Sequence, residues 1–339
     1  MGRTEPGTYR NSWKPPAYEV DDNGKVADAE PHDPHNWGRW GPEDQRGTAN
    51  LITAQEIVNA AALIKTGEMH SLAIPIDADA PVHYTRPKAM RIHTIAGSDF
   101  ITGSPANTHL PGQQWTDDII IMALQGSTQW DGLAHFLRDD CMYNGWWAGL
   151  VTAAGGAARN GIEHQRESLV GRGVLLDVCG HRGGTPLPGG YVITPEALDA
   201  VAASQGTMLR RGDIVTVRTG HLGLWYTFGG DRARQDEWFT TEPGLSGRCA
   251  AWAKDRDIAG LAIDNWAIDV VPFEPDATLP FPFHQAAIPG VGLTCGEFWW
   301  LDDLAAACAR AGRYEFFLAA QPLYVVNASG SMLNPIAIL

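Results

Sequence analysis

Short apolar runs alternate with helix signals along this chain, and this alternation is the feature that most restricts how it can fold. Residues 173–178 (GVLLDV) and 212–220 (GDIVTVRTG) are short, rich in aliphatic residues and begin at a glycine, as buried strands often do. Between them, Thr194 provides an N-cap ahead of Pro195, and the helix predicted there ends at Gly206. Interleaved strands and helices predict an α/β fold.

The same alternation continues toward the C-terminal end. Four further elements are predicted there: a helix over residues 246–255, a strand and its continuation over 258–271, a helix from Thr294 to Gly312, and a strand over 316–326. Upstream, Thr53 and Glu56 fit a capping box that opens a helix ending at Gly67.

The chain is expected to divide unevenly. Residues 1–50 lack a strand or helix period and are predicted to form an extended arm, whereas residues 51–339 are predicted to form a single domain. Within that domain, the proline-rich residues 74–117 are expected to form a long irregular loop. Long loops in compact domains are usually lids or binding loops.

Composition excludes several classes of partner. The 339 residues carry a net charge of −14, whereas nucleic acids and anionic membranes are bound by clustered Lys and Arg. No apolar run approaches the roughly 20 residues that span a bilayer. The five cysteines are an odd number without a CxxC pair, which predicts reduced thiols and therefore a cytoplasmic protein. A small-molecule substrate is the expected partner.

The most polar stretch, residues 125–136 (QGSTQWDGLAHF), follows an apolar run. It places Asp131 four residues before His135, with two amides upstream at Gln125 and Gln129. By itself, this pattern is compatible with a strand end, an Asp-Gly turn and a packed histidine. It is also compatible with half of an active site.

A second cluster lies downstream, where His284 stands in FPFHQAAIPG and Glu297 follows thirteen residues later. Each residue has a structural explanation. His284 fits a loop histidine stacked on a phenylalanine, and Glu297 fits the capping partner of Thr294.

Two more clusters follow predicted strands. His221 comes directly after the strand at 212–220, and Asp264 and Asn265 lie within the apolar residues 258–271. Strand ends are where α/β folds place active-site residues, although Asp264 could equally cap a turn.

Considered together and in order, these clusters resemble the metal-dependent cyclase, or kynurenine formamidase, superfamily. The signature of that family is H-x-G-T-H-x-D-x-P-x-H, followed far downstream by a His and then a Glu. Thr128, Asp131 and His135 hold signature positions here, and His284 and Glu297 hold the downstream ones. The chain departs from the signature at two histidines, replaced by Gln125 and Gln129, and at the proline, replaced by Leu133.

The resemblance implies a swivelling β/β/α fold with a mixed β-sheet or barrel core, flanking helices, and a homodimer or higher homo-oligomer. It assigns a divalent metal to Asp131, His284 and Glu297, with Gln129 and Gln125 as amide-oxygen ligands where the family has imidazoles. Because amide oxygen is the harder ligand, Mn²⁺ is favoured relative to a formamidase, and Zn²⁺ stays open. One well-occupied metal is expected.

The implied activity is a metal-dependent hydrolase of a carbonyl substrate, namely a cyclic amide, an aryl formamide or a lactone. Metal-activated water would attack the carbonyl, and His135 would transfer the proton. Trp130, His221 and Asn265 are expected to line the substrate pocket. Two alternatives remain open: a cyclase or isomerase that acts by proton transfer, with or without metal, and a small-molecule binding protein without catalysis.

Overall fold

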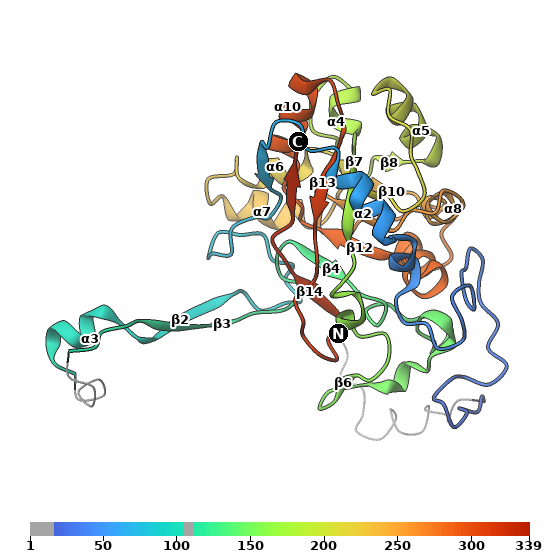
Figure 1. The fold of residues 1–339 in the computed structure, drawn as a ribbon, viewed down its shortest axis with the longest axis horizontal. Coiled ribbons are helices and arrows are strands. Elements are labelled where there is room, and N and C mark those ends of the chain that lie inside the picture. Colours follow the sequence, from blue (N-terminus) through green and yellow to red (C-terminus); the bar gives the residue numbers. More distant parts are fainter. Residues whose placement is uncertain (1–16, 105–111) are drawn as a thin grey trace.

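The computed structural model describes residues 17–104 and 112–339, and a curled nine-stranded mixed sheet forms the centre of the fold (Figure 1). In spatial order the strands are β1 (Met69–Ser71), β15 (Ile336–Ile338), β13 (Glu315–Ala319), β7 (Val170–Asp177), β9 (Ile214–Arg218), β11 (Gly260–Ile263), β12 (Thr294–Glu297), β4 (Gln129–Asp131) and β14 (Gly330–Met332). The four central strands, β7, β9, β11 and β12, run parallel, and the strands on either side pair antiparallel. The predicted α/β class is confirmed.

The parallel strands are buried on both faces, which explains their almost continuous apolar sequence. Alternate residues of β7 belong to different cores: Val174 and Leu176 pack on one face, and Leu175 on the other. Helices α5 (Pro195–Ser204) and α8 (Cys249–Asp255) cover the first face, and α10 (Asp302–Ala311) covers the second. The strands predicted at residues 173–178 and 212–220 are therefore confirmed.

Two helix starts match their local signals. The Thr194 hydroxyl accepts a hydrogen bond from the backbone N–H of Ala197 and caps α5. Helix α2 (Ala54–Ala61) opens with the predicted capping box of Thr53 and Glu56. It ends at Ala61, earlier than the predicted Gly67.

The prediction of a helix that begins at Thr294 is wrong. Residues 294–297 form strand β12, which is fully buried between β11 and β4, and α10 begins only at Asp302. The Thr-x-x-Glu spacing of a capping box occurs equally well in a strand, and here sheet pairing overrides it. Strand β13 also ends at Ala319, before the predicted residue 326.

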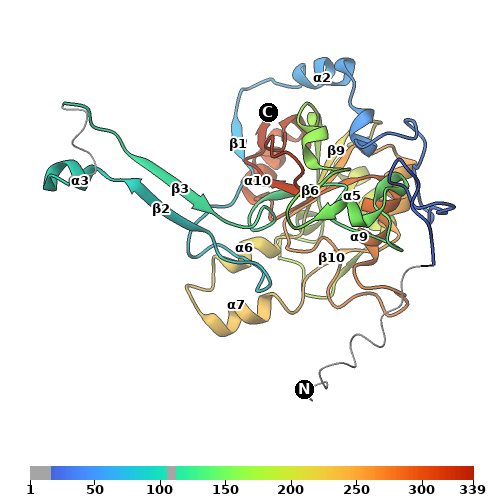
Figure 2. The ribbon, with the colours of Figure 1, turned by 90° about the horizontal axis from the view of Figure 1, so that it is seen from below.

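The predicted loop at residues 74–117 contains regular structure. Strands β2 (Met90–Ile95) and β3 (Asp117–Ile121) pair antiparallel and project from the body as an arm, which carries α3 (Gly97–Thr102) at its outer end (Figures 1 and 2). Ile119, Ile120 and Ile121 are about half exposed there, at 46%, 47% and 55%. The irregular-loop prediction is therefore wrong for the paired residues.

Short elements complete the chain. They are η1 (Gly47–Leu51), η3 (Tyr143–Gly145), η4 (Ala148–Leu150), β5 (Val151–Thr152), β6 (Gly156–Ala157), η5 (Ile162–Gln165), α4 (Val178–His181), β8 (Val192–Ile193), α6 (His221–Trp225), α7 (Arg232–Trp238), β10 (Gly244–Leu245), α9 (Pro282–Ala286) and η6 (Ala287–Val291). Among the described residues, no helix has the length and apolar character needed to cross a bilayer.

Candidate functional site

Strands β4 and β12 bring together Asp131 and Glu297, which lie far apart in the sequence. They pair antiparallel with Gln129 opposite Glu297 and Asp131 opposite Cys295. Because directly opposed residues of an antiparallel pair point to the same face, the side chains of Gln129, Asp131 and Glu297 converge. All three are almost fully buried.

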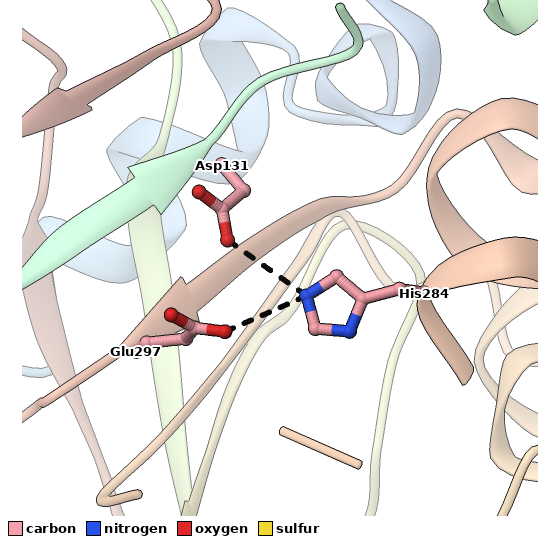
Figure 3. A group of neighbouring side chains, drawn as sticks. All are labelled: Asp131, His284 and Glu297. Carbon is pink, nitrogen blue, oxygen red and sulfur yellow. Dashed lines mark ion pairs between the residues drawn. The ribbon is translucent and has the colours of Figure 1, made fainter. Parts of the chain in front are cut away.

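His284 completes the group from helix α9 (Figure 3). Its Nε2 lies 3.8 Å from Asp131 Oδ2 and 3.5 Å from Glu297 Oε1. One ligand atom from each of the three residues lies within 4.8 Å of the others. The structure therefore brings together the three principal metal ligands that the sequence predicted.

Asp269 orients this histidine, and sequence reasoning missed it. Its Oδ2 lies 2.6 Å from His284 Nδ1, and its Oδ1 accepts the backbone N–H of Phe283 at 2.6 Å. A carboxylate on one ring nitrogen fixes the tautomer and leaves the other nitrogen free for a metal. The only signal in the sequence was an acidic residue inside the apolar residues 258–271, since a buried carboxylate needs a partner.

Two buried acceptors of this group have no hydrogen-bond partner in the described part of the chain: Asp131 Oδ2 and Gln129 Oε1. The Gln129 amide nitrogen instead donates to Glu297 Oε2 at 2.7 Å. A rotation of the amide by about 180° would exchange the two ends and turn the oxygen toward the carboxylates, which a cation there would favour. Unpaired buried acceptors, two carboxylates and an oriented imidazole fit a divalent cation.

The carboxylates and His284 also perturb one another. Burial and the neighbouring charge of Asp131 raise the pKa of Glu297 to about 7. Burial opposes protonation of His284, but the carboxylates of Asp131, Asp269 and Glu297 outweigh it and hold its pKa well above the usual value. A dication would relieve the same excess of negative charge.

His135 lies beside this group and is more accessible. Its Nε2 is 3.5 Å from Asp131 Oδ1, and its side chain is 21% exposed, whereas the Asp131 side chain is 0% exposed. Burial, together with the charges of His284 and Arg86, outweighs the attraction of Asp131 and lowers the pKa of His135. A neutral imidazole at pH 7 can accept a proton, as the predicted role requires.

The two glutamines separate in the structure. Gln129 lies among the metal-binding side chains, whereas the Gln125 amide nitrogen lies 3.5 Å from His135 Nδ1 and 3.2 Å from the Ser329 hydroxyl. The hydrogen bonds of the Gln125 side chain therefore go to His135 and Ser329. This position differs from the metal-ligand role expected for it.

The family model named Cyclase matches residues 70–270, more than half of the chain. This protein belongs to the cyclase family. A solved structure, described as a novel cyclase, is 42% identical to this protein in sequence, with a TM-score of 0.84. The match covers 90% of this chain and 99% of that one. The resemblance read from the sequence is confirmed.

More distant structures share the fold of this cyclase-family chain. Isatin hydrolase A from Labrenzia aggregata, bound to benzyl benzoate, is 18% identical with a TM-score of 0.56, covering 84% of this chain and 97% of that one. Isatin hydrolase A from Ralstonia solanacearum is 17% identical with a TM-score of 0.57, with the same coverage of 84% and 97%. A search of curated proteins found no match.

The three residues expected to line a substrate pocket have different surroundings in this chain. Trp130 points to the face of β4 opposite Asp131, is fully buried, and donates its Nε1–H to the backbone oxygen of Ala320. The amide of Asn265 is equally buried and bonds the backbone of Pro243 and Ile268. Trp130 points into the core because successive residues of a strand face opposite sides of the sheet. The amide of Asn265 is used by the hydrogen bonds of a turn, so both side chains have structural roles here.

His221 differs from these two. It is 4% exposed, and its ring stacks on Trp238 with centroids 4.7 Å apart. It lines an open cleft beside Leu187, and neither ring nitrogen has a hydrogen-bond partner among the described residues. Asp264, in contrast, caps the turn before His221 by accepting hydrogen bonds from Thr219 and Gly220.

Proposed function

We propose that this cyclase-family protein is a divalent-metal hydrolase that opens a carbonyl substrate: a cyclic amide, an aryl formamide or a lactone. The observation that carries the proposal is the buried group of Asp131, His284 and Glu297, whose ligand atoms lie within 4.8 Å of one another. Two structurally similar chains are named isatin hydrolases, and isatin is a cyclic amide, so this class is tested first.

The donor set determines which ion fits. Asp131, Glu297 and the Gln129 amide offer oxygen, and His284 offers one nitrogen. This oxygen-rich set favours Mn²⁺, and Zn²⁺ also fits two carboxylates and an imidazole. When bound, such an ion would polarise the substrate carbonyl and lower the pKa of water.

The chain's own residues would handle the proton. His135 is neutral and accessible, so its Nε2 would accept a proton from the attacking water as the C–O bond forms. Asp131 Oδ1, 3.5 Å away, would stabilise the resulting imidazolium. His135 would then return the proton to the departing nitrogen or oxygen as its bond to carbon breaks. The amide of Gln125, beside Nδ1, would hold the ring in place.

The test begins with the metal content of the purified protein and a screen of isatin, N-formylaniline and an aromatic lactone. We expect about one ion per chain, hydrolysis of at least one substrate, and loss of that activity on chelation, restored by Mn²⁺. Turnover that survives complete metal removal would refute the metal hydrolase and favour metal-free proton transfer. Ligand binding without turnover of any compound would favour a binding protein.

A further inference from the structure

We propose that a cavity beside the candidate metal centre binds an anionic group, so that the substrate is an aromatic carboxylate that also carries the scissile amide or ester. The cavity lies between residues 80–88 and helix α7 and has a volume of about 460 Å³. We call it the arginine pocket, after Arg86. The inference rests on the proposed function for the scissile bond, but the binding of the anion can be tested without turnover.

Aromatic rings form one wall of the arginine pocket. Trp225 and Phe239 both line it, with ring centroids 5.5 Å apart. Behind them, Trp266 stacks on His83 with centroids 4.8 Å apart, and Phe239 packs within 6.0 Å of Trp266. Flat apolar walls and a volume of this size suit a ligand with one or two aromatic rings.

Two cations in the same pocket make hydrogen bonds to backbone oxygens and form no ion pair with any described residue. Arg86 Nη1 donates to the backbone oxygen of Gln125, and Lys88 Nζ donates to the backbone oxygen of Ala78. No ion pair within 4.0 Å involves either residue in the described part of the chain.

The third cation of the pocket, Arg232, differs because it pairs with Asp236 at 3.4 Å. The lining of the pocket therefore holds three cations and one carboxylate, in a chain whose net charge is −14. Arg and Lys in such a setting bind carboxylate through charge-assisted hydrogen bonds.

Arg86 connects the pocket to the reacting groups. Its guanidinium holds the backbone of Gln125 at 2.6 Å, and the side chain of Gln125 lies 3.5 Å from His135 Nδ1. The charge of Arg86 also contributes to the lowered pKa of His135, after burial and the charge of His284. Only Gln125 would therefore separate an anion bound to Arg86 from His135. The same molecule would then be able to place a carbonyl at the metal centre.

Calorimetric titration of the metal-loaded protein with 2-naphthoate and with its neutral isostere 2-naphthamide tests the inference. We expect naphthoate to bind at least tenfold more tightly, since its carboxylate can accept charge-assisted hydrogen bonds from Arg86 and Lys88 that a neutral amide cannot match. Arg86→Gln and Lys88→Gln should each reduce naphthoate affinity while leaving naphthamide affinity unchanged. Lys65→Gln, at an exposed lysine that also donates to a backbone oxygen, is the charge-matched control and should change neither.

Equal affinity for the two ligands would overturn the inference. A carboxylate preference that disappears on chelation but survives Arg86→Gln would also overturn it, because the carboxylate would then sit on the metal. The Lys88→Gln variant keeps the test valid if Arg86→Gln disturbs folding, since Lys88 is exposed.

Failure of this inference and failure of the proposed function remain distinguishable. Hydrolysis of neutral isatin without any preference for naphthoate would leave the hydrolase standing and remove the anion site. The protein could instead prefer naphthoate clearly, lose that preference in the Arg86 and Lys88 variants, and hydrolyse no compound. That result would leave the anion site standing and remove the hydrolase.

Discussion

Asp269 Oδ2 lies 2.6 Å from His284 Nδ1, and this contact determines that the Nε2 atom of His284 faces Asp131 and Glu297. The side chains of Asp269 and His284 are almost fully buried, with exposures of 0% and 2%. A carboxylate in this position fixes the ring orientation and makes Nε2 a stronger donor.

Asp269→Asn is therefore expected to weaken metal binding without abolishing it. The amide oxygen can still accept from Nδ1, but the charge that increases the basicity of the imidazole is lost. We expect a decrease in Mn²⁺ affinity of roughly 10- to 100-fold, with the stoichiometry retained at saturating metal. Competition titration against a chelator measures both. Asp276→Asn, at an exposed residue of the same segment, is the control, and equal affinities in the two variants would remove Asp269 from the site.

Asp131 and His135 should respond differently to substitution. Asp131→Asn removes a charged ligand and should lower metal occupancy in elemental analysis. His135→Ala should keep the metal and lower kcat by roughly 10²–10⁴, because only proton transfer is lost. Equal loss of metal in both variants would make His135 a ligand. Wild-type rates in the metal-free His135→Ala protein would contradict the mechanism.

The two glutamines provide a matched pair of substitutions. Gln129 contacts Glu297, so Gln129→His should place an imidazole at the metal and raise the ratio of Zn²⁺ to Mn²⁺ affinity. Gln125 contacts His135 and Ser329, so Gln125→His should leave that ratio unchanged and alter the activity. Metal titrations of both variants measure the ratio. A shift produced by Gln125→His alone would reverse the roles assigned to the two residues.

His221 predicts a specific dependence of stability on pH. Burial lowers its pKa to about 4, below the value near 6.5 of an unfolded chain. Between these values the unfolded chain binds a proton that the folded protein does not, so this residue reduces stability as pH falls from about 6.5 toward 4. His221→Phe preserves stacking on Trp238 and removes this titration. Its free energy of unfolding should decrease less on acidification, by up to about 1.4 kcal/mol per pH unit.

Urea unfolding of wild type and His221→Phe between pH 4 and 7.5 measures this slope. His181→Phe, at an exposed histidine, controls for the loss of one imidazole and should follow the wild type. Parallel curves for the wild type and His221→Phe would show that burial does not lower the pKa of His221.

Local signals predicted the elements that depend on local interactions. The N-cap at Thr194, the capping box of Thr53 and Glu56, and the β-branched residues of β9 are each readable within a few positions, and each element forms where expected. Local signals failed at residues 294–297, because the spacing of a capping box is also compatible with a strand. Only the pairing of β12 with β4 and β11 decides between them.

The sequence by itself determined the α/β class, since strand composition and helix caps are properties of the linear chain. Through the order of its motifs and their resemblance to a family, it also predicted Asp131, His135, His284 and Glu297 as candidate site residues. Only the tertiary structure decided which side chains meet. The register of β4 against β12 turns Gln129 and Asp131 toward Glu297 and turns Trp130 into the core. The folding of residues 264–270 against α9 brings Asp269 to His284. The register of β4 against β12 depends on hydrogen bonds and packing between segments more than a hundred residues apart in the sequence, which no local pattern encodes. The contact between Asp269 and His284 spans fifteen residues, still beyond the reach of a cap or strand pattern.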